Sequence, residues 1–326
     1  MRSAFIAPAV ALALVAVGCS SESDADQAAT STDEGWSYQD ATGATISLPE
    51  IPTKIVTDAP TASALIPLGI KPVAIWTGGP LDEDLSLAGL DISGIESAGD
   101  SWEGPNIETL AAIEPDVIIT GWYPLENAYG TISADPPSLI ESVKKIAPVV
   151  GVLNTQSALA VIEDFTELAE TLGAETDSGT VAADKEAFDT AKARFEAAVA
   201  AKPDLQVVAV SPDTDSAYVA NPPDFPEFLD LADWGLKLYT PTDVVDRGYY
   251  SNISWENFAS IPSGLVYYDN RFSEATPETL GTGWSVWQSY PAVAAGHTVG
   301  WQTQTFNNYP AYTAHLDALS AGIEAV

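Results

Sequence analysis

Cysteine, histidine and basic residues are scarce in this chain of 326 residues. It has one cysteine and two histidines, and its 12 lysines and arginines face 46 aspartates and glutamates. A single cysteine excludes an intramolecular disulfide, and two histidines are too few for a metal-ion receptor built on imidazole ligands. The formal net charge of −34 excludes nucleic-acid binding through a basic surface, and it disfavours direct contact with anionic lipid headgroups.

Signatures of catalysis are also missing from the sequence. It contains no G-x-S-x-G elbow, no H-E-x-x-H, no C-x-x-C and no P-loop. Carboxylates are so abundant that a glycosidase-like pair cannot be inferred from them. The sequence therefore favours a protein that is not an enzyme. Dispersed acids of this kind are typical of a soluble surface, with attraction of a cationic or neutral ligand as the alternative.

A short apolar segment lies near the N-terminus. Arg2 provides a positive charge, residues 4–17 are apolar or small, and acidic residues follow Cys19. This order is typical of an export signal, and the run is too short to cross a hydrocarbon core of roughly 30 Å as a helix. The segment predicts export, not a membrane-spanning anchor.

The sequence AVGC at residues 16–19 resembles the lipobox of bacterial lipoproteins, although that family prefers leucine where Ala16 stands. The resemblance implies removal of residues 1–18 and lipid modification of Cys19, which holds the protein on the extracytoplasmic face of the cell membrane. The alternative is an ordinary signal peptide with an unrelated cysteine. Residues 19–35 are acidic and have no large apolar side chain, so they predict a disordered tether.

Strand-like and helix-like segments alternate in two stretches of the chain. The first has strands at residues 44–48, 54–57, 72–77, 116–120 and 148–152 and helices at 61–68, 106–113 and 138–146. The second has strands at residues 205–211, 217–221, 237–240, 265–269 and 298–302 and helices at 225–234, 255–260 and 312–323. Such alternation predicts mainly parallel sheets covered by helices.

Helical periodicity dominates the middle of the chain. Apolar residues recur at three- and four-residue spacing over residues 159–172, and a second helix begins after Asp177 and Ser178. Without an internal proline the second helix extends for about 35 Å.

The predicted fold class is therefore α/β, with two mainly parallel-sheet lobes joined by one long rigid helix. Residues 36–176 form the expected N-terminal lobe, residues 177–202 the connecting helix and residues 203–326 the C-terminal lobe.

Four phrases in order resemble the substrate-binding lipoproteins of ABC importers for iron–siderophore complexes and cobalamin, the helical-backbone class of periplasmic binding proteins. They are ATGATISLPEIPTKIVTDAPTASALIPLGIKPVAI, NIETLAAIEPDVIIT, ISWENFASIPSGLVYYD and WQSYPAVAAGHTVGW. The resemblance covers the chain from about Tyr38 to the C-terminus. It implies a ligand in the cleft between two lobes, with little closure because the helix is rigid.

The resemblance also implies a function. The lipid-anchored receptor would bind a ferric siderophore and deliver it to an ABC permease dimer with a cytoplasmic ATPase. No cofactor and no protein metal ligand are implied, because the siderophore holds the iron. Glu108 in PNIETL and Glu256 in ISWENF match the family's two permease-docking acids; the alternative is that each is a helix-start acid favoured by the helix dipole.

Loops that follow the strands are expected to line the cleft. The candidate ligand-binding residues are Trp76, Trp102, Trp122, Tyr123, Arg247, Tyr249, Arg271 and Trp287. Core packing is the alternative for each tryptophan, and a surface ion pair is the alternative for each arginine. Ferric tris-catecholates are anionic and need a basic cluster. The few bases and many aromatics therefore favour a neutral or cationic ferric hydroxamate.

Other ligands and other classes stay open. Haem receptors of this class bind the iron through tyrosine or histidine. His297 and His315 have the sequence context of structural residues, so Tyr123, Tyr249 or Tyr268 would have to bind a haem iron. Cobalamin is a further ligand of the same importer class. A surface interaction lipoprotein is less favoured, because the family phrases occur in order.

Overall fold

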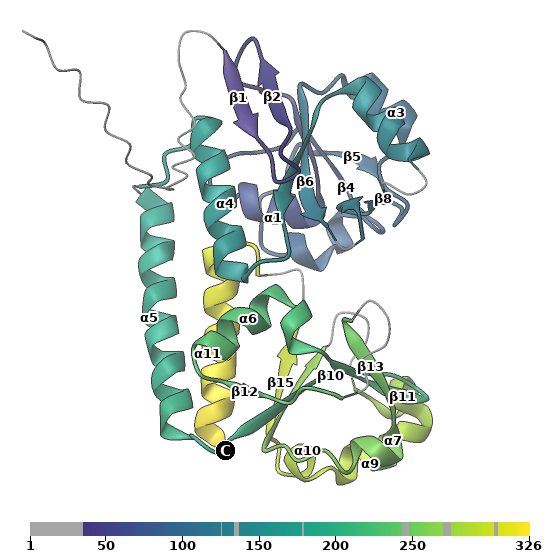
Figure 1. Cartoon of the computed structure of the whole chain (residues 1–326), viewed down its shortest axis with the longest axis vertical. Coiled ribbons are helices and arrows are strands. Elements are labelled where there is room, and N and C mark those ends of the chain that lie inside the picture. Colours follow the sequence, from purple (N-terminus) through teal and green to yellow (C-terminus); the bar gives the residue numbers. More distant parts are fainter. Residues whose placement is uncertain are drawn as a thin grey trace, which may run out of the picture.

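The computed structural model describes residues 35–124, 126–133, 137–177, 179–242, 248–269, 275–302 and 306–326. These form two α/β lobes, one above the other in Figure 1, with helices α5 (Gly179–Ala201) and α11 (Tyr309–Ala325) alongside. The predicted fold class is confirmed. The predicted leader, the tether up to residue 34 with Cys19, and the two candidate arginines Arg247 and Arg271 lie outside the described residues.

A seven-stranded sheet forms the centre of the N-terminal lobe. Its strands run in the order β5-β4-β3-β6-β7-β8, and β9 also pairs with β6. Their bounds are β3 Ile55–Asp58, β4 Ala74–Trp76, β5 Glu96–Gly99, β6 Val117–Tyr123, β7 Ala128–Tyr129, β8 Ile132–Ser133 and β9 Val149–Leu153. Strands β5, β4, β3, β6 and β9 are mutually parallel, whereas β7 and β8 are antiparallel additions.

Helices cover this sheet, and a hairpin extends the lobe. They are α1 Ala59–Leu65, η1 Leu81–Glu83, η2 Leu85–Leu87, α2 Ile107–Ile113, α3 Ser138–Ile146 and α4 Ala158–Thr171. The hairpin of β1 (Trp36–Gln39) and β2 (Thr45–Leu48) packs on α4, where the Trp36 indole donates a 3.0 Å hydrogen bond to Thr171 Oγ1.

The C-terminal lobe has a mixed sheet. Its order is β13-β11-β10-β14-β15, with β12 also paired to β10. The bounds are β10 Gln206–Pro212, β11 Ser216–Ala220, β12 Lys237–Leu238, β13 Tyr250–Ser254, β14 Leu265–Asp269 and β15 Thr298–Trp301. Strands β12, β10, β14 and β15 are parallel, whereas β11 runs antiparallel to both of its neighbours, β10 and β13. Only residues 213–215 join β10 to β11, and so short a link allows a hairpin but no crossover.

Short helices complete the C-terminal lobe. They are η3 Pro222–Asp224, α6 Pro226–Asp233, α7 Trp255–Phe258, α8 Pro277–Leu280, η4 Gly281–Gly283, α9 Trp284–Ser289 and α10 Pro291–Ala294. Among the described residues, no helix is both long enough and apolar enough to cross a membrane.

Helix α5 joins the lobes and contributes to the C-terminal core. Its buried Phe188 and Phe195 lie seven residues apart on one face, and Phe188 packs 5.3 Å from the ring of Tyr312 on α11. The lobes are also tied together directly. Asp230 of α6 accepts hydrogen bonds from the amide of Leu159 on α4 (2.8 Å) and from the Tyr312 hydroxyl (3.0 Å). Helix α4 of the N-terminal lobe and helix α6 of the C-terminal lobe therefore pack against each other.

Candidate ligand-binding site

A pocket of about 540 Å³ opens at the carboxyl ends of parallel strands in the N-terminal lobe. Asp58 ends β3, Trp76 ends β4 and Tyr123 ends β6, and all three line the pocket. Open α/β sheets bind ligands at this edge, and small-molecule sites commonly measure about 300–1,000 Å³. Location and size both indicate a binding site for a small molecule.

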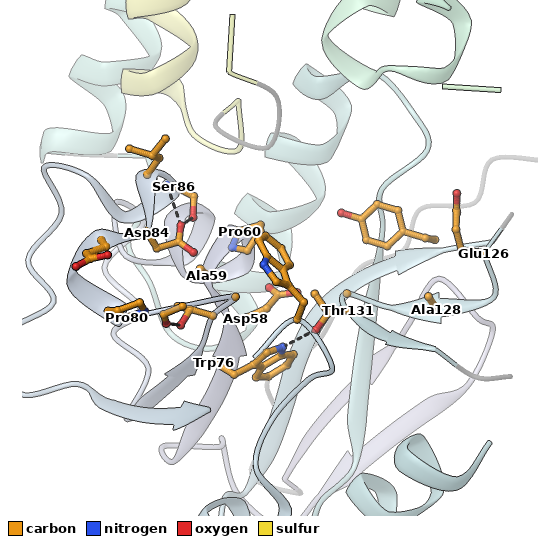
Figure 2. Close-up of a pocket in the computed structure, with 18 of the residues that line it drawn as sticks. Asp58, Ala59, Pro60, Trp76, Pro80, Asp84, Ser86, Glu126, Ala128 and Thr131 are labelled. Carbon is orange, nitrogen blue, oxygen red and sulfur yellow. Dashed lines mark hydrogen bonds between the residues drawn. The ribbon is translucent and has the colours of Figure 1, made fainter. Parts of the chain in front are cut away.

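Carboxylates are the charged groups of the described lining. Asp58, Glu83, Asp84 and Glu126 line the pocket, and no described lysine, arginine or histidine does. Figure 2 shows Asp84 and Glu126 on opposite sides with Asp58 between them. The described wall therefore disfavours an anionic ligand and favours a neutral or cationic one.

Asp58 is the most deeply buried of these acids, at 5% exposure. Its Oδ1 accepts the amide hydrogen of Thr61 at 2.9 Å and so caps α1, and its Oδ2 accepts from the Thr120 hydroxyl at 2.6 Å. Burial raises the pKa of Asp58, although these hydrogen bonds oppose the rise. Gly130 closes over this group with a positive φ of 58°, where a β-carbon would collide with the carboxylate.

Two tryptophans contribute to the pocket in different ways. Trp76 is fully buried, and its indole nitrogen donates a 3.1 Å hydrogen bond to Thr131 Oγ1, which fixes the ring in the wall. Trp102 is 63% exposed and lies over Gly78, because a β-carbon at that glycine would overlap the indole. Trp102 thus presents a large apolar face to the pocket and to solvent.

Two tyrosines meet the pocket from different lobes. Tyr123 accepts a hydrogen bond from the Asn154 side chain, and burial, followed by the charge of Asp58, raises the pKa of its phenol. Tyr249 is the described lining residue from the C-terminal lobe. Burial is the main cause of its raised pKa, its hydrogen bond to the Glu126 carboxylate comes next, and the charges of Glu126 and Asp224 add to it.

The structure does not place the other described candidates at the pocket. Trp122 packs on Tyr129 with ring centroids 4.6 Å apart, and it contacts the core of the N-terminal lobe. Trp287 is 4% exposed and packs in the C-terminal core against Trp255 and Tyr268. For both residues the observed environment is the core packing weighed as the alternative.

Sequence reasoning did not select the acids of the lining. Nothing distinguishes Asp84 or Glu126 among 46 acidic residues, because they come together only through the fold. Asp58 did carry a signal: an aspartate directly after a buried strand, three residues before Thr61, is typical of a helix N-cap.

Glu108 and Glu256 occupy equivalent positions on the two lobes. Each is the exposed second residue of a helix, in α2 and α7 respectively. The preceding caps also match: Asn106 Oδ1 accepts from the Thr109 amide at 3.0 Å, and Ser254 Oγ from the Asn257 amide at 3.3 Å. Two exposed carboxylates are thus held at ordered helix starts, one on each lobe.

Neither histidine lines the pocket. His315 stacks on Phe306 with ring centroids 4.0 Å apart, and burial lowers its pKa to about 4. His297 precedes β15, and its carbonyl accepts from the Val266 amide at 3.0 Å. Within the described ranges, no group of three or more histidine, cysteine, aspartate or glutamate side chains could hold a metal ion.

Two α/β lobes, a long connecting helix and a pocket at the strand ends define a substrate-binding protein of the bilobal type. The family model described as periplasmic binding protein matches residues 76–305, and the chain belongs to this family. The family resemblance read from the sequence is confirmed. Membership also agrees with the expectation that the protein is not an enzyme, because the family consists of substrate-binding receptors.

Similar proteins include one curated sequence and several solved structures. The probable siderophore-binding lipoprotein YfiY of Bacillus subtilis is 30% identical over 131 residues, which span 39% of each chain. DesE, a ferric-siderophore receptor protein from Streptomyces coelicolor, is 28% identical with a TM-score of 0.79, covering 89% of this chain and 98% of that one. FhuD2 from Staphylococcus aureus with bound ferrioxamine B has a TM-score of 0.58 at 19% identity, covering 83% and 98%, and shares the fold.

Proposed function

We propose that this protein is a lipid-anchored extracytoplasmic receptor that binds a ferric siderophore and delivers it to an ABC permease. The observation that carries the proposal is the pocket of about 540 Å³ at the strand ends, lined by tryptophan, tyrosine and carboxylate side chains. Its support from relatives is the ferric-siderophore receptor DesE, 28% identical across most of the chain.

A ferric hydroxamate is the ligand class that suits the described wall. Three hydroxamates bound to Fe³⁺ give a neutral iron centre, whereas three catecholates leave it with several negative charges. Four carboxylates and no described base line the pocket, so an anionic complex would meet repulsion without compensating donors. The exposed ring of Trp102 offers apolar surface to the organic part of the siderophore.

Delivery depends on features outside the pocket. Glu108 and Glu256 would contact basic residues of the permease dimer, and their matched positions on the two lobes would set the orientation of docking. Lipid attached to Cys19 would keep the receptor at the membrane, where its effective concentration near the permease is high.

Titration of intrinsic tryptophan fluorescence tests the binding proposal. We expect quenching by ferric trihydroxamates of the ferrioxamine type and little response to ferric enterobactin, haemin or cobalamin. Tighter binding of ferric enterobactin would contradict the hydroxamate assignment, and a Soret band with haemin at comparable affinity would establish the haem alternative. If the protein binds none of the ferric siderophores offered, the receptor proposal is wrong.

Uptake of radiolabelled iron tests delivery separately. The double variant Glu108→Ala, Glu256→Ala should keep wild-type ligand affinity and lose most uptake, and Cys19→Ala should do the same by releasing the receptor. Glu141→Ala, an exposed acid on α3, is the matched control and should transport normally. Unchanged uptake by the double variant would remove the docking role.

A further inference from the structure

Glu126 has an unsatisfied oxygen at the pocket. It lies on the loop between β6 and β7, on the opposite side of the pocket from Asp84 (Figure 2). Its Oε2 is buried and has no hydrogen-bond partner among the residues that the structure describes. Both carboxylate oxygens of Asp58, by contrast, accept a hydrogen bond, one from Thr61 and the other from Thr120.

A buried carboxylate oxygen without a donor is unfavourable, because it has lost water and gained nothing in return. The described groups around Glu126 offer no positive charge. Asp58 and Glu126 both act on the phenol of Tyr123, and Glu126 and Asp224 both act on that of Tyr249. Tyr249 hydrogen-bonds to the Glu126 carboxylate but brings no positive charge. A ligand at the open side of the pocket can supply the donor that Oε2 lacks, and a cationic donor would also offset the surrounding negative charge.

We propose that the pocket recognises a ferric siderophore that carries a protonated amine, and that Glu126 receives this ammonium group. The inference rests on the proposed function, because it takes a ferric siderophore to be the occupant. An ammonium group donates hydrogen bonds and neutralises a carboxylate, whereas an amide at the same place does only the first. Glu126 thereby selects within the hydroxamates, favouring those with a free amine over acylated or cyclic ones.

Two ligands that differ only in the amine give the test. Ferrioxamine B ends in a primary amine, and its N-acetyl derivative replaces that amine with a neutral amide. We expect the wild-type protein to bind ferrioxamine B about tenfold more tightly than the acetyl derivative. Glu126→Gln should remove most of this preference and change the Kd of the acetyl derivative by less than about twofold.

Matched controls separate this effect from general charge and from misfolding. Glu141→Gln removes the same charge from an exposed position on α3 and should retain the wild-type preference. Raised salt should narrow the difference between the two ligands in the wild type but not in Glu126→Gln. Circular dichroism melting curves establish that each variant is folded.

The outcomes distinguish this inference from the proposed function. Equal affinity of the wild-type protein for both ligands, or a preference that survives Glu126→Gln, overturns the ammonium site while ferric-siderophore binding still stands. Tighter binding of an anionic ferric tris-catecholate than of ferrioxamine B also overturns it. Binding of none of these complexes contradicts the proposed function itself, and the ammonium site with it.

Discussion

The two lobes share an α/β architecture but use their aromatic residues differently. In the N-terminal lobe, Trp76, Trp102 and Tyr123 reach the pocket. In the C-terminal lobe the large aromatics pack against each other instead: the ring of Phe228 lies 4.7 Å from that of Trp301, and both side chains are fully buried. Among the described residues, the N-terminal lobe thus supplies most of the pocket wall, while the C-terminal lobe contributes Tyr249 and packs its other large aromatics into a core.

Four acids with buried carboxylate oxygens differ in role between the lobes. In the C-terminal lobe, Glu227 accepts a 2.8 Å hydrogen bond from the Trp301 indole, and Asp230 holds α4 and α11 together. In the N-terminal lobe, Asp58 lines the pocket, and so does Glu126 with its unpartnered oxygen. The two acids of the C-terminal lobe stabilise the fold, whereas Asp58 and Glu126 face the pocket; Asp40, a buried acid of the N-terminal lobe away from the pocket, accepts from the Gly151 amide at 3.1 Å and stabilises the fold.

The largest expected effect is on the stability of the C-terminal core. Phe228→Ala removes a fully buried ring, so the free energy of unfolding should fall by about 3–5 kcal/mol, measured by urea denaturation. Folded molecules of the variant should bind the siderophore with wild-type affinity. A loss of affinity without a loss of stability would break the division between the lobes.

The second largest effect is a loss of folding stability at low pH. Burial lowers the pKa of His315 to about 4 from an ordinary 6.5. Between pH 4 and 6.5 the imidazole is therefore protonated in the unfolded chain but neutral in the native state. The stabilisation is complete above pH 6.5 and is lost as the pH falls towards 4, by roughly 2–3 kcal/mol.

A variant without the imidazole checks this origin. His315→Gln should show a smaller loss of unfolding free energy than the wild type between pH 6.5 and 4, because no buried histidine has to be protonated. Denaturant curves at several pH values measure it. The same loss in both proteins would assign the acid sensitivity to other groups.

The third effect is the converse of the first: ligand affinity should fall while the stability of the fold is unchanged. Trp102→Ala should weaken binding of a ferric trihydroxamate about five- to tenfold, because an exposed indole leaves the pocket wall. Its free energy of unfolding should stay within about 0.5 kcal/mol of the wild type. Ile51→Ala, at another exposed apolar residue that does not line the pocket, is the control and should change neither quantity.

The smallest effect comes from displacing the same ring. A β-carbon at Gly78 overlaps the indole of Trp102, so Gly78→Ala should move the ring and weaken binding about two- to fivefold. In the Trp102→Ala background the same substitution should have no further effect, which a double-mutant cycle measures. Additive losses would show that Gly78 acts on the ligand by another route.

Much of the fold could be predicted because its signals are local. Periodicity and flanking residues located α4 and α5, with Ser157 capping one helix and Gly173 following it. Strands β7 and β8 have two residues each and left no pattern to recognise. The antiparallel pairing of β11 and β13 depends on a short turn and on contacts between distant segments, so alternation alone suggested a more parallel sheet than the structure has.

The pocket could be predicted only in part, for a related reason. Trp76 and Tyr123 end strands and Trp102 follows one, and the rule for open sheets places such residues at the binding edge. Trp287 looked equivalent, but its helix turns it into the core. Glu126 could not be predicted as a site residue, because it meets Tyr249 only in the folded protein and the two are more than a hundred residues apart in sequence.

Hydrogen–deuterium exchange with and without saturating ferrioxamine B tests the division between the lobes most directly. The account predicts the strongest protection in peptides that cover residues 76–86 and 120–131, with the buried strands β10 and β14 of the C-terminal lobe unchanged. Protection confined to the C-terminal lobe, with none at the N-terminal pocket, would contradict it.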